Sequence, residues 1–460
     1  MKKSPINLLF VFSDQHRWCD LGCYGNSDVI SPNIDAFASE GLRFDQCYSN
    51  CPLCVPARGN LLTGLHSMRH GAVANDLPID TDLESVAHVL NRAGHESGYI
   101  GKWHLAGVPR DQSVPAEERM GFQSWKVRQC SHDYLNPEYH DESGVLHKVP
   151  GYEPEIQTDL AKSFISENQS NPWGLVLSWG PPHDPYDKVP EKYRKLFDPE
   201  KLKLRPNVPE MIRHNLKKEV SQETIREWMA GYYAHIAGLD EQFGRLVQHV
   251  KDLGLWENTL IVYTSDHGDL LGSQGLTLKQ LPYEESAHIP LILGGGVPEL
   301  RQGECKELIG FVDLFPTLLG MMGLSYSTEI DGSDLSQLLR CESAKGREEI
   351  YLYNPIPCHH GVDRGDGCWR AIRKGNHVFA LNLDDDSDWF LYDVVQDPFQ
   401  LNNLLGKSEE DDRVASELRR DLMREVGRYD AALPWPELID QLGLRDRWNT
   451  SQRYFDLPEM

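Results

Sequence analysis

Two apolar segments of the chain lead into side chains that can bind a metal ion. Asp14 and Gln15 follow the run at residues 6–12, and Asp266 and His267 follow a second run of strand length. Because ligands in open α/β sheets bind beyond the carboxyl ends of the strands, we expect these groups at one sheet edge. Carboxylate, amide and imidazole ligands suit a divalent cation, foremost Ca²⁺, with Mg²⁺ or Mn²⁺ as alternatives. Alternatively, the two aspartates only cap the helices that follow them.

Cys54 is the candidate nucleophile, because it begins the string Cys54-Val55-Pro56-Ala57-Arg58. Proline suits the first turn of a helix, where its missing N–H is not needed. Cys54 would then lie at a helix N-terminus, whose dipole and free N–H groups favour an anionic nucleophile and a bound anion. Two other interpretations stay open: a small buried cysteine beside a turn, or an unmodified reactive thiol whose pKa the helix terminus lowers.

The segment from Cys54 to Gly64 resembles the signature of the type I sulfatases, which reads Cys-x-Pro-x-Arg followed by Leu-Leu-Thr-Gly. This family has the alkaline-phosphatase-like fold. Further segments resemble the family's other landmarks, in the expected order along most of the chain. They are Asn33-Ile34-Asp35, Gly98-Tyr99-Ile100-Gly101-Lys102-Trp103-His104-Leu105, Pro182-His183-Asp184-Pro185-Tyr186, Lys279, Tyr283-Glu284-Glu285, Val312-Asp313-Leu314-Phe315-Pro316-Thr317, Leu391-Tyr392-Asp393 and Asp397-Pro398.

The resemblance implies that a maturation enzyme oxidises Cys54 to formylglycine, whose hydrate attacks the sulfur of a sulfate ester beside one divalent cation. The implied metal ligands are Asp14, Gln15, Cys54, Asp266 and His267.

The resemblance also implies roles for five cationic side chains. Arg58, together with the metal, would favour the ionised nucleophile. Lys102, His183 and Lys279 would bind the sulfate oxygens, and His183 or Lys279 would protonate the departing alcohol. His104 would act as the base that expels sulfate. The alternative for each is a solvated lysine or a hydrogen-bonded core histidine.

Gln15 departs from the family pattern, in which a second aspartate is common, so we expect weaker metal binding or a more electrophilic metal. Phosphonate hydrolases of the same fold often carry Asp-Gln, and hydrolysis of phosphonate or phosphate esters is therefore the alternative activity. Those phosphonate hydrolases replace the basic pair that is equivalent to Lys102 and His104. The presence of this pair here therefore favours a sulfate ester. A catalytically silent binding module is a further alternative, against which the complete set of site residues argues.

Polar residues in irregular segments are candidates for substrate recognition, because functional loops often carry specificity. Each of them could instead be an ordinary surface residue. A carbohydrate sulfate, either a monosaccharide or a short oligosaccharide, is the preferred substrate hypothesis. The candidates are Asn75, Asp76, His132, Asp133, His359, His360, Asp363 and Arg364.

Composition narrows the possible partners. The 460 residues carry a net charge of −24, which argues against a nucleic-acid surface. No apolar run reaches the length of a membrane span. The apolar run at residues 6–12 ends in Asp14 and not in a small-residue cleavage site, so we expect a cytoplasmic protein, or a periplasmic or secreted one if a signal has been removed. The ten irregularly spaced cysteines do not indicate a disulfide framework. Assembly into a homo-oligomer stays open.

Buried apolar runs alternate with helical patterns, which predicts an α/β fold with a large, mostly parallel sheet sandwiched by helices. A capping box at residues 81–84 predicts a helix that ends near Gly94. From about residue 369, short strand patterns predict a smaller antiparallel sheet, followed by a helix at 414–426 and a loose tail. We place a domain boundary near residue 365, between a catalytic domain (1–365) and a C-terminal α+β subdomain with its tail (366–460).

Overall fold

Strand β1 (Asn7–Asp14) lies inside an 11-stranded sheet in the computed structural model, which describes residues 5–215 and 217–455. The strand order is β12-β2-β11-β10-β1-β7-β3-β4-β5-β6, and β13 also pairs with β2. The other bounds are β2 Leu42–Tyr48, β3 Glu96–Lys102, β4 Ser124–Arg128, β5 Glu138–Asp141, β6 Leu146–Lys148, β7 Trp173–Pro182, β10 Thr259–Ser265, β11 His288–Gly294, β12 Gly303–Cys305 and β13 Ile309–Gly310.

The centre of this sheet is parallel and its flanks are mixed. Strand β1 runs parallel to both β7 and β10, and β3 runs parallel to β7 and β4. Strand β11 is antiparallel to β10 and β2, and β5 is antiparallel to β4. The predicted large, mostly parallel sheet is therefore confirmed, and the carboxyl ends of β1 and β10 lie side by side.

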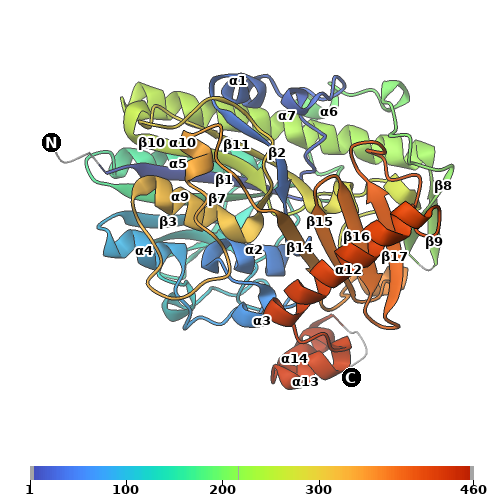
Figure 1. The fold of residues 1–460 in the computed structure, drawn as a ribbon. Helices are drawn as coiled ribbons and strands as arrows, with labels where there is room; N and C mark the ends of the chain where they lie inside the picture. Colours follow the sequence, from blue (N-terminus) through green and yellow to red (C-terminus); the bar gives the residue numbers. More distant parts are fainter. Residues whose placement is uncertain (1–4, 216, 456–460) are drawn as a thin grey trace.

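Alternate residues of β1 enter two different cores, because successive side chains of a strand point to opposite faces. Leu8, Phe10 and Phe12 pack in a cluster with residues of α2, α4 and α9. Leu9 and Val11 pack in another cluster with residues of α1, α5 and α7. Helices thus cover both faces of the sheet (Figure 1).

The helices on the two faces have the following bounds. On one face lie α2 Cys54–Thr63, α4 Val86–Arg92 and α9 Leu314–Met322, and on the other α1 Pro32–Glu40, α5 Glu153–Glu167 and α7 Gln222–Asp252. The shorter helices are α3 Ser67–His70, α6 Glu191–Arg194, α8 Glu284–Ala287, α10 Gln337–Arg340 and α11 His360–Arg364. None of the helices in the described ranges has the length and apolar composition needed to span a bilayer.

The start predicted for helix α4 is wrong. Ser85 is the N-cap, and its capping box pairs with His88 and not across residues 81–84. Glu84 instead accepts hydrogen bonds from the backbone N–H groups of Ser327 and Thr328. A distant loop therefore occupies the carboxylate that the local pattern assigned to the helix.

The smaller antiparallel sheet is confirmed and has four strands in the order β14-β15-β16-β17. Their bounds are β14 Glu349–Asn354, β15 Trp369–Lys374, β16 His377–Asn382 and β17 Ser387–Asp393. Helix α12 (Glu409–Tyr429) crosses this sheet (Figure 1). Because β14 comes from the segment before residue 365, the predicted domain boundary stays a prediction. A separate hairpin pairs β8 (Met211–Asn215) with β9 (Lys218–Ser221).

The predicted loose tail is instead two helices, α13 (Trp435–Gln441) and α14 (Arg445–Tyr454). Leu438, Ile439 and Trp448 are buried in a cluster shared with the small sheet and α12. Figure 1 places α13 and α14 together at one end of the molecule, beside the end of α12. Both helices are short, so this burial and not local propensity holds them in place.

Candidate active site

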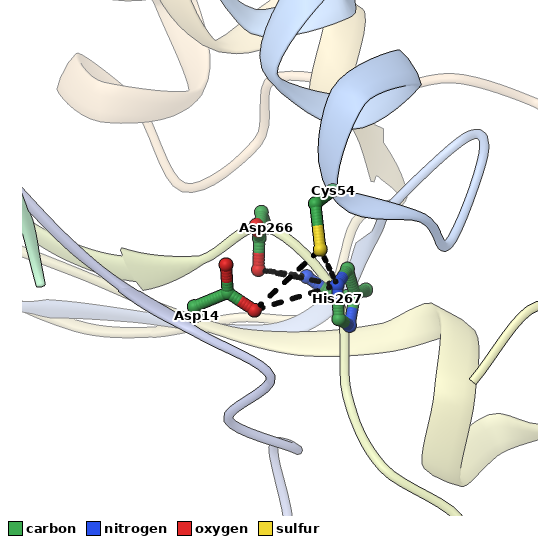
Figure 2. A group of neighbouring side chains, drawn as sticks. All are labelled: Asp14, Cys54, Asp266 and His267. Carbon is green, nitrogen blue, oxygen red and sulfur yellow. Dashed lines mark hydrogen bonds and ion pairs between the residues drawn. The ribbon is translucent and has the colours of Figure 1, made fainter. Parts of the chain in front are cut away.

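Four potential metal ligands converge where β1, β10 and α2 meet. Asp14 is the last residue of β1, Asp266 and His267 directly follow β10, and Cys54 begins α2. Their side chains point toward one another in Figure 2. One ligand atom from each lies within 4.8 Å of the others, and all four side chains are buried. Parallel pairing of β1 and β10, with Ser13 opposite Ser265, delivers the two aspartates to one point.

The spacing of these groups leaves room for a cation between them. Cys54 Sγ lies 3.2 Å from His267 Nε2 and 3.7 Å from Asp14 Oδ1. His267 Nε2 lies 3.7 Å from the Oδ1 atoms of both aspartates. Among the described residues, the buried Asp266 Oδ2 accepts no hydrogen bond of good geometry and has only the ion pair with Arg58 Nη2 at 3.1 Å, so it keeps capacity for a cation. These donors suit a divalent ion.

Gln15 joins this cluster through a constrained backbone. Its φ is 71°, and its N–H donates to Asp266 Oδ1 over 3.1 Å. The side-chain Nε2 donates to Asp269 Oδ2 over 2.7 Å, which leaves Oε1 to accept from Lys279 Nζ at 2.5 Å. Tyr186 donates its hydroxyl to the same Asp269 oxygen at 2.5 Å. Asp269 thus fixes the orientation of the Gln15 amide, a function that no local pattern revealed.

Arg58 links the metal cluster to the neighbouring strands. Its Nη2 lies 2.9 Å from Asp14 Oδ2 and 3.1 Å from Asp266 Oδ2. Its Nη1 donates to the Lys102 carbonyl and to Ser178 Oγ, each over 2.7 Å. The side chain is only 1% exposed. A buried guanidinium with these bonds holds both carboxylates in place and offsets their repulsion.

Lys102 gives the site a second buried cation. Its Nζ lies 2.6 Å from Asp14 Oδ2 and 4.0 Å from Cys54 Sγ. Burial alone would raise the pKa of the Cys54 thiol, but Lys102, Lys279 and His267 hold that pKa well below its usual range. Burial would likewise raise the pKa of Asp14, yet Lys102, His183 and Arg58 lower it. The position of Cys54 therefore favours an anionic group.

His183 and Lys279 form a pair on another side of Cys54. The Nδ1 atom of His183 lies 2.8 Å from the Asp184 carbonyl, to which it donates. Its Nε2 is therefore free to accept from Lys279 Nζ at 2.6 Å. The ring of His132 stacks on His183, with centroids 4.5 Å apart. This arrangement brings the Lys279 amine and the His183 imidazole into direct hydrogen-bond contact.

His104 lies beside Asp76, with 3.5 Å between Nε2 and Oδ1. Burial disfavours the imidazolium, but Cys130, Asp76 and Cys54 raise the pKa of His104 to about 10. Asp76 is itself fully buried and also binds two cavity residues. Arg110 donates to both of its oxygens at 2.7 and 2.8 Å, and His359 Nε2 lies 2.7 Å from Oδ2.

These groups face a cavity of about 650 Å³. Of the candidates for substrate recognition, Asn75, His132, His359 and Asp363 line it. The remaining lining residues are Cys54, Lys102, His104, Arg110, His183, Lys279, Gln280, Cys358, Val362, Trp435, Trp448, Gln452 and Phe455. Asn75 also accepts a hydrogen bond from the N–H of Val55 in α2.

The other candidates lie elsewhere. Arg364 is buried and donates to the carbonyls of Thr277 and Lys279, so it fixes the loop that carries Lys279. Asp133 is exposed and accepts from Asn136. The side chain of His360 is outside the part of the chain that the structure describes.

Sequence reasoning missed several residues of the cavity. Arg110 lies in an irregular segment, and Trp435, Trp448 and Phe455 lie in the segment interpreted as a loose tail. The signal available was the recurrence of the aromatic residues Trp435, Trp448 and Phe455 near the C-terminus. All ten cysteines are unpaired, Cys54 among them.

Comparison with known proteins agrees with this geometry. A family model described as "Sulfatase" matches residues 6–324, and one described as "N-sulphoglucosamine sulphohydrolase, C-terminal" matches residues 272–427. The chain is 34% identical over 409 residues to an ulvan-active sulfatase of Formosa agariphila, covering 88% of this chain and 78% of that protein.

Solved structures give the same result. A putative sulfatase from Bacteroides fragilis matches with a TM-score of 0.84 at 28% identity, covering 94% of this chain and 98% of that one. A second structure, in complex with its substrate D-glucosamine-2-N,6-O-disulfate, matches with a TM-score of 0.81 at 25% identity, covering 93% and 98%. The family model spans well over half of the chain, and the chain therefore belongs to the sulfatase family and is a sulfuric ester hydrolase.

Proposed function

We propose that this sulfatase removes sulfate from a sulfated monosaccharide or short oligosaccharide, with Cys54 converted to formylglycine as the nucleophile. One observation carries the proposal. Cys54 begins a buried helix and lines the cavity, and its Sγ lies 3.2 Å from His267 Nε2 and 4.0 Å from Lys102 Nζ. The relatives named for ulvan and for a glucosamine disulfate support a carbohydrate substrate. A formylglycine-generating enzyme would supply the oxidation.

A divalent cation fits the residues present. Asp14, Asp266, His267 and residue 54 would hold it, together with Gln15, whose N–H donates to Asp266 Oδ1 and whose Oε1 accepts from Lys279. Ca²⁺ is the preferred ion, because three of the five donors are oxygen-bearing side chains. When bound, the cation and the formylglycine would supply Lewis-acid activation and a hydroxyl nucleophile.

The chain's own cations would bind the sulfate group. Lys102 and Lys279 both lie close enough to Cys54 to lower its pKa, and both line the cavity. Two ammonium groups would offset the charge that develops on the sulfuryl oxygens in the transition state. Arg58 would keep Asp14 and Asp266 in position and is not a lining residue.

The pair of His183 and Lys279 would protonate the departing alcohol. Nδ1 of His183 is committed to the Asp184 carbonyl, so Nε2 can exchange a proton only with Lys279 or with the substrate. His104, held by Asp76, would accept the proton whose removal releases sulfate, because conversion of Cys54 to formylglycine removes a thiol that helps to keep this imidazole protonated. The acid and the base thus come from different parts of the cavity.

Hydrolysis of phosphonate or phosphate esters is the rival activity, and a substrate panel separates the two. The enzyme is prepared with the maturation enzyme and Ca²⁺, then assayed on sulfated monosaccharides, 4-nitrophenyl sulfate, 4-nitrophenyl phosphate and a phosphonate monoester. The proposal expects the highest kcat/KM on a sulfated sugar. A higher kcat/KM on the phosphorus esters, or activity only on long sulfated polymers, would contradict it.

A further inference from the structure

The C-terminal helices close one side of the cavity with aromatic rings. Trp435 begins α13, Trp448 lies on α14, and Phe455 directly follows α14. All three line the cavity that also contains Cys54, Lys102 and Lys279. We call these three residues the aromatic wall. None of them belongs to the group of candidate metal ligands or to the cations assigned to the sulfate.

The two tryptophans are held rigidly by the C-terminal core. Their rings lie 5.4 Å apart at an angle of 46°. Trp448 is only 4% exposed and packs in the same buried cluster as Leu438 and Ile439, with Trp435 packed against that cluster. A rigid ring loses little conformational entropy when a ligand binds to it.

Phe455 is held by two residues of the cavity. The Arg110 guanidinium carbon lies 4.6 Å from the centre of the Phe455 ring, and the His359 ring meets it edge-on at 5.1 Å. Arg110 and His359 are both bound by Asp76, which also contacts His104. Phe455 is therefore connected to His104 through Arg110, His359 and the buried Asp76 carboxylate.

Polar groups border the aromatic wall. Asp363, Gln452 and His359 line the same cavity, and they offer a carboxylate, an amide and an imidazole. A sugar ring has apolar C–H faces and a polar edge of hydroxyl groups, so it matches apolar rings flanked by hydrogen-bonding groups. The cavity of about 650 Å³ also lies within the range of roughly 300–1,000 Å³ that is usual for small-ligand sites.

We propose that the aromatic wall is the saccharide-binding subsite of this enzyme, on which the pyranose ring bearing the sulfate, or the ring next to it, stacks. This inference rests on the proposed function, since it names where the carbohydrate part of the substrate binds. The wall and the sulfate-binding cations share one cavity, so a single substrate can contact both. The C-terminal helices would thereby determine which sulfated sugar is accepted.

The test compares Trp435→Ala and Phe455→Ala with the wild type. Both residues are partly exposed, so their truncation disturbs the core less than truncation of Trp448 would. The matched control is Trp256→Ala, which removes another partly exposed tryptophan that packs beside Lys251 and does not line this cavity. For each protein, KM and kcat are measured on the best sulfated saccharide of the panel, together with the Ki of inorganic sulfate and the melting temperature.

If the wall binds the sugar, each wall variant raises KM by about tenfold to hundredfold, as expected for an aromatic group at the centre of a binding site. The Ki of inorganic sulfate stays within about twofold of wild type, because sulfate binds only the cations. The control changes neither value. Unchanged KM in the folded wall variants would overturn the inference and leave the proposed function intact. A wild type that cleaves no sulfated saccharide would overturn both.

Discussion

Lys279→Met tests the assignment of the general acid. The Nζ of Lys279 lies 2.6 Å from His183 Nε2 and 2.5 Å from Gln15 Oε1, and the side chain is 2% exposed. Methionine keeps the length of the side chain and removes both the charge and the proton. Arg364 holds the Lys279 carbonyl through its own guanidinium, so the loop keeps its backbone anchor.

The expected loss depends on the leaving group. A sugar alkoxide needs a proton as it leaves, so a sulfated sugar loses general-acid catalysis, worth about 10²–10⁴, as well as charge stabilisation, worth about 10²–10³. We therefore expect kcat/KM to fall by about 10⁴ or more on the sugar. A 4-nitrophenolate leaves without a proton, so only the charge contribution of about 10²–10³ is lost.

Lys102→Met is the matched control for this assay. Lys102 pairs with Asp14 and not with His183, so we assign it charge stabilisation and not proton transfer to the leaving group. We expect similar losses of about 10²–10³ on the sulfated sugar and on 4-nitrophenyl sulfate. Steady-state kinetics on both substrates measure the ratio directly. Equal losses on the two substrates for Lys279→Met would refute its role as the acid.

Three further predictions concern stability and the metal. Glu153 is buried, and burial raises its pKa to about 7 although the Gly180 N–H lowers it, so the unfolded chain ionises first. Stability is therefore lost as pH rises from about 4.5 to about 7. Glu153→Gln should raise the free energy of unfolding by up to about 3 kcal/mol at pH 8 and by nothing measurable at pH 4. Chemical-denaturation curves of wild type and variant that coincide at pH 8 would count against this. Gln15→Asp adds a carboxylate beside Asp14 and Asp266 and should tighten Ca²⁺ binding by about tenfold in calorimetry; an unchanged Kd would contradict the assignment of Gln15 to the metal site. With a chelator present, the free energy of unfolding should be about 2.7 kcal/mol lower than with Ca²⁺ at 100 times its Kd, and added Ca²⁺ should restore it. A melting temperature that changes neither with the chelator nor with Ca²⁺ would argue against a metal at Asp14 and Asp266.

The parts of the fold that the sequence predicted are those with continuous local signals. Strand β1 is buried on both faces, and its apolar run marks it without further information. Helices α13 (Trp435–Gln441) and α14 (Arg445–Tyr454) are too short to show a helical repeat, and their stability comes from the insertion of Leu438 and Trp448 into a core shared with α12. That core exists only in the folded molecule, so local patterns indicated a tail.

In the site, too, local signals predicted some residues, whereas contacts between distant segments could not be predicted. Asp14 and Asp266 follow strands that pair in parallel, so their approach was predictable from strand order. The contact of Asp269 with Gln15 and the contacts of Asp76 with Arg110 and His359 join residues from distant segments. No periodicity or motif records such pairs. Asp76 in particular reads as a loop residue in the sequence, whereas its fully buried carboxylate binds three other side chains.

The nucleophile at position 54 is the centre of this account, and one measurement tests it directly. The enzyme is produced with and without a formylglycine-generating enzyme, and peptide mass spectrometry gives the fraction of residue 54 in which one oxygen has replaced the sulfur and two hydrogens. Hydrolysis of the sulfated sugar is then measured against that fraction. We predict a rate proportional to the aldehyde fraction and a background rate for Cys54→Ala. Equal rates for the thiol and aldehyde forms would contradict the account.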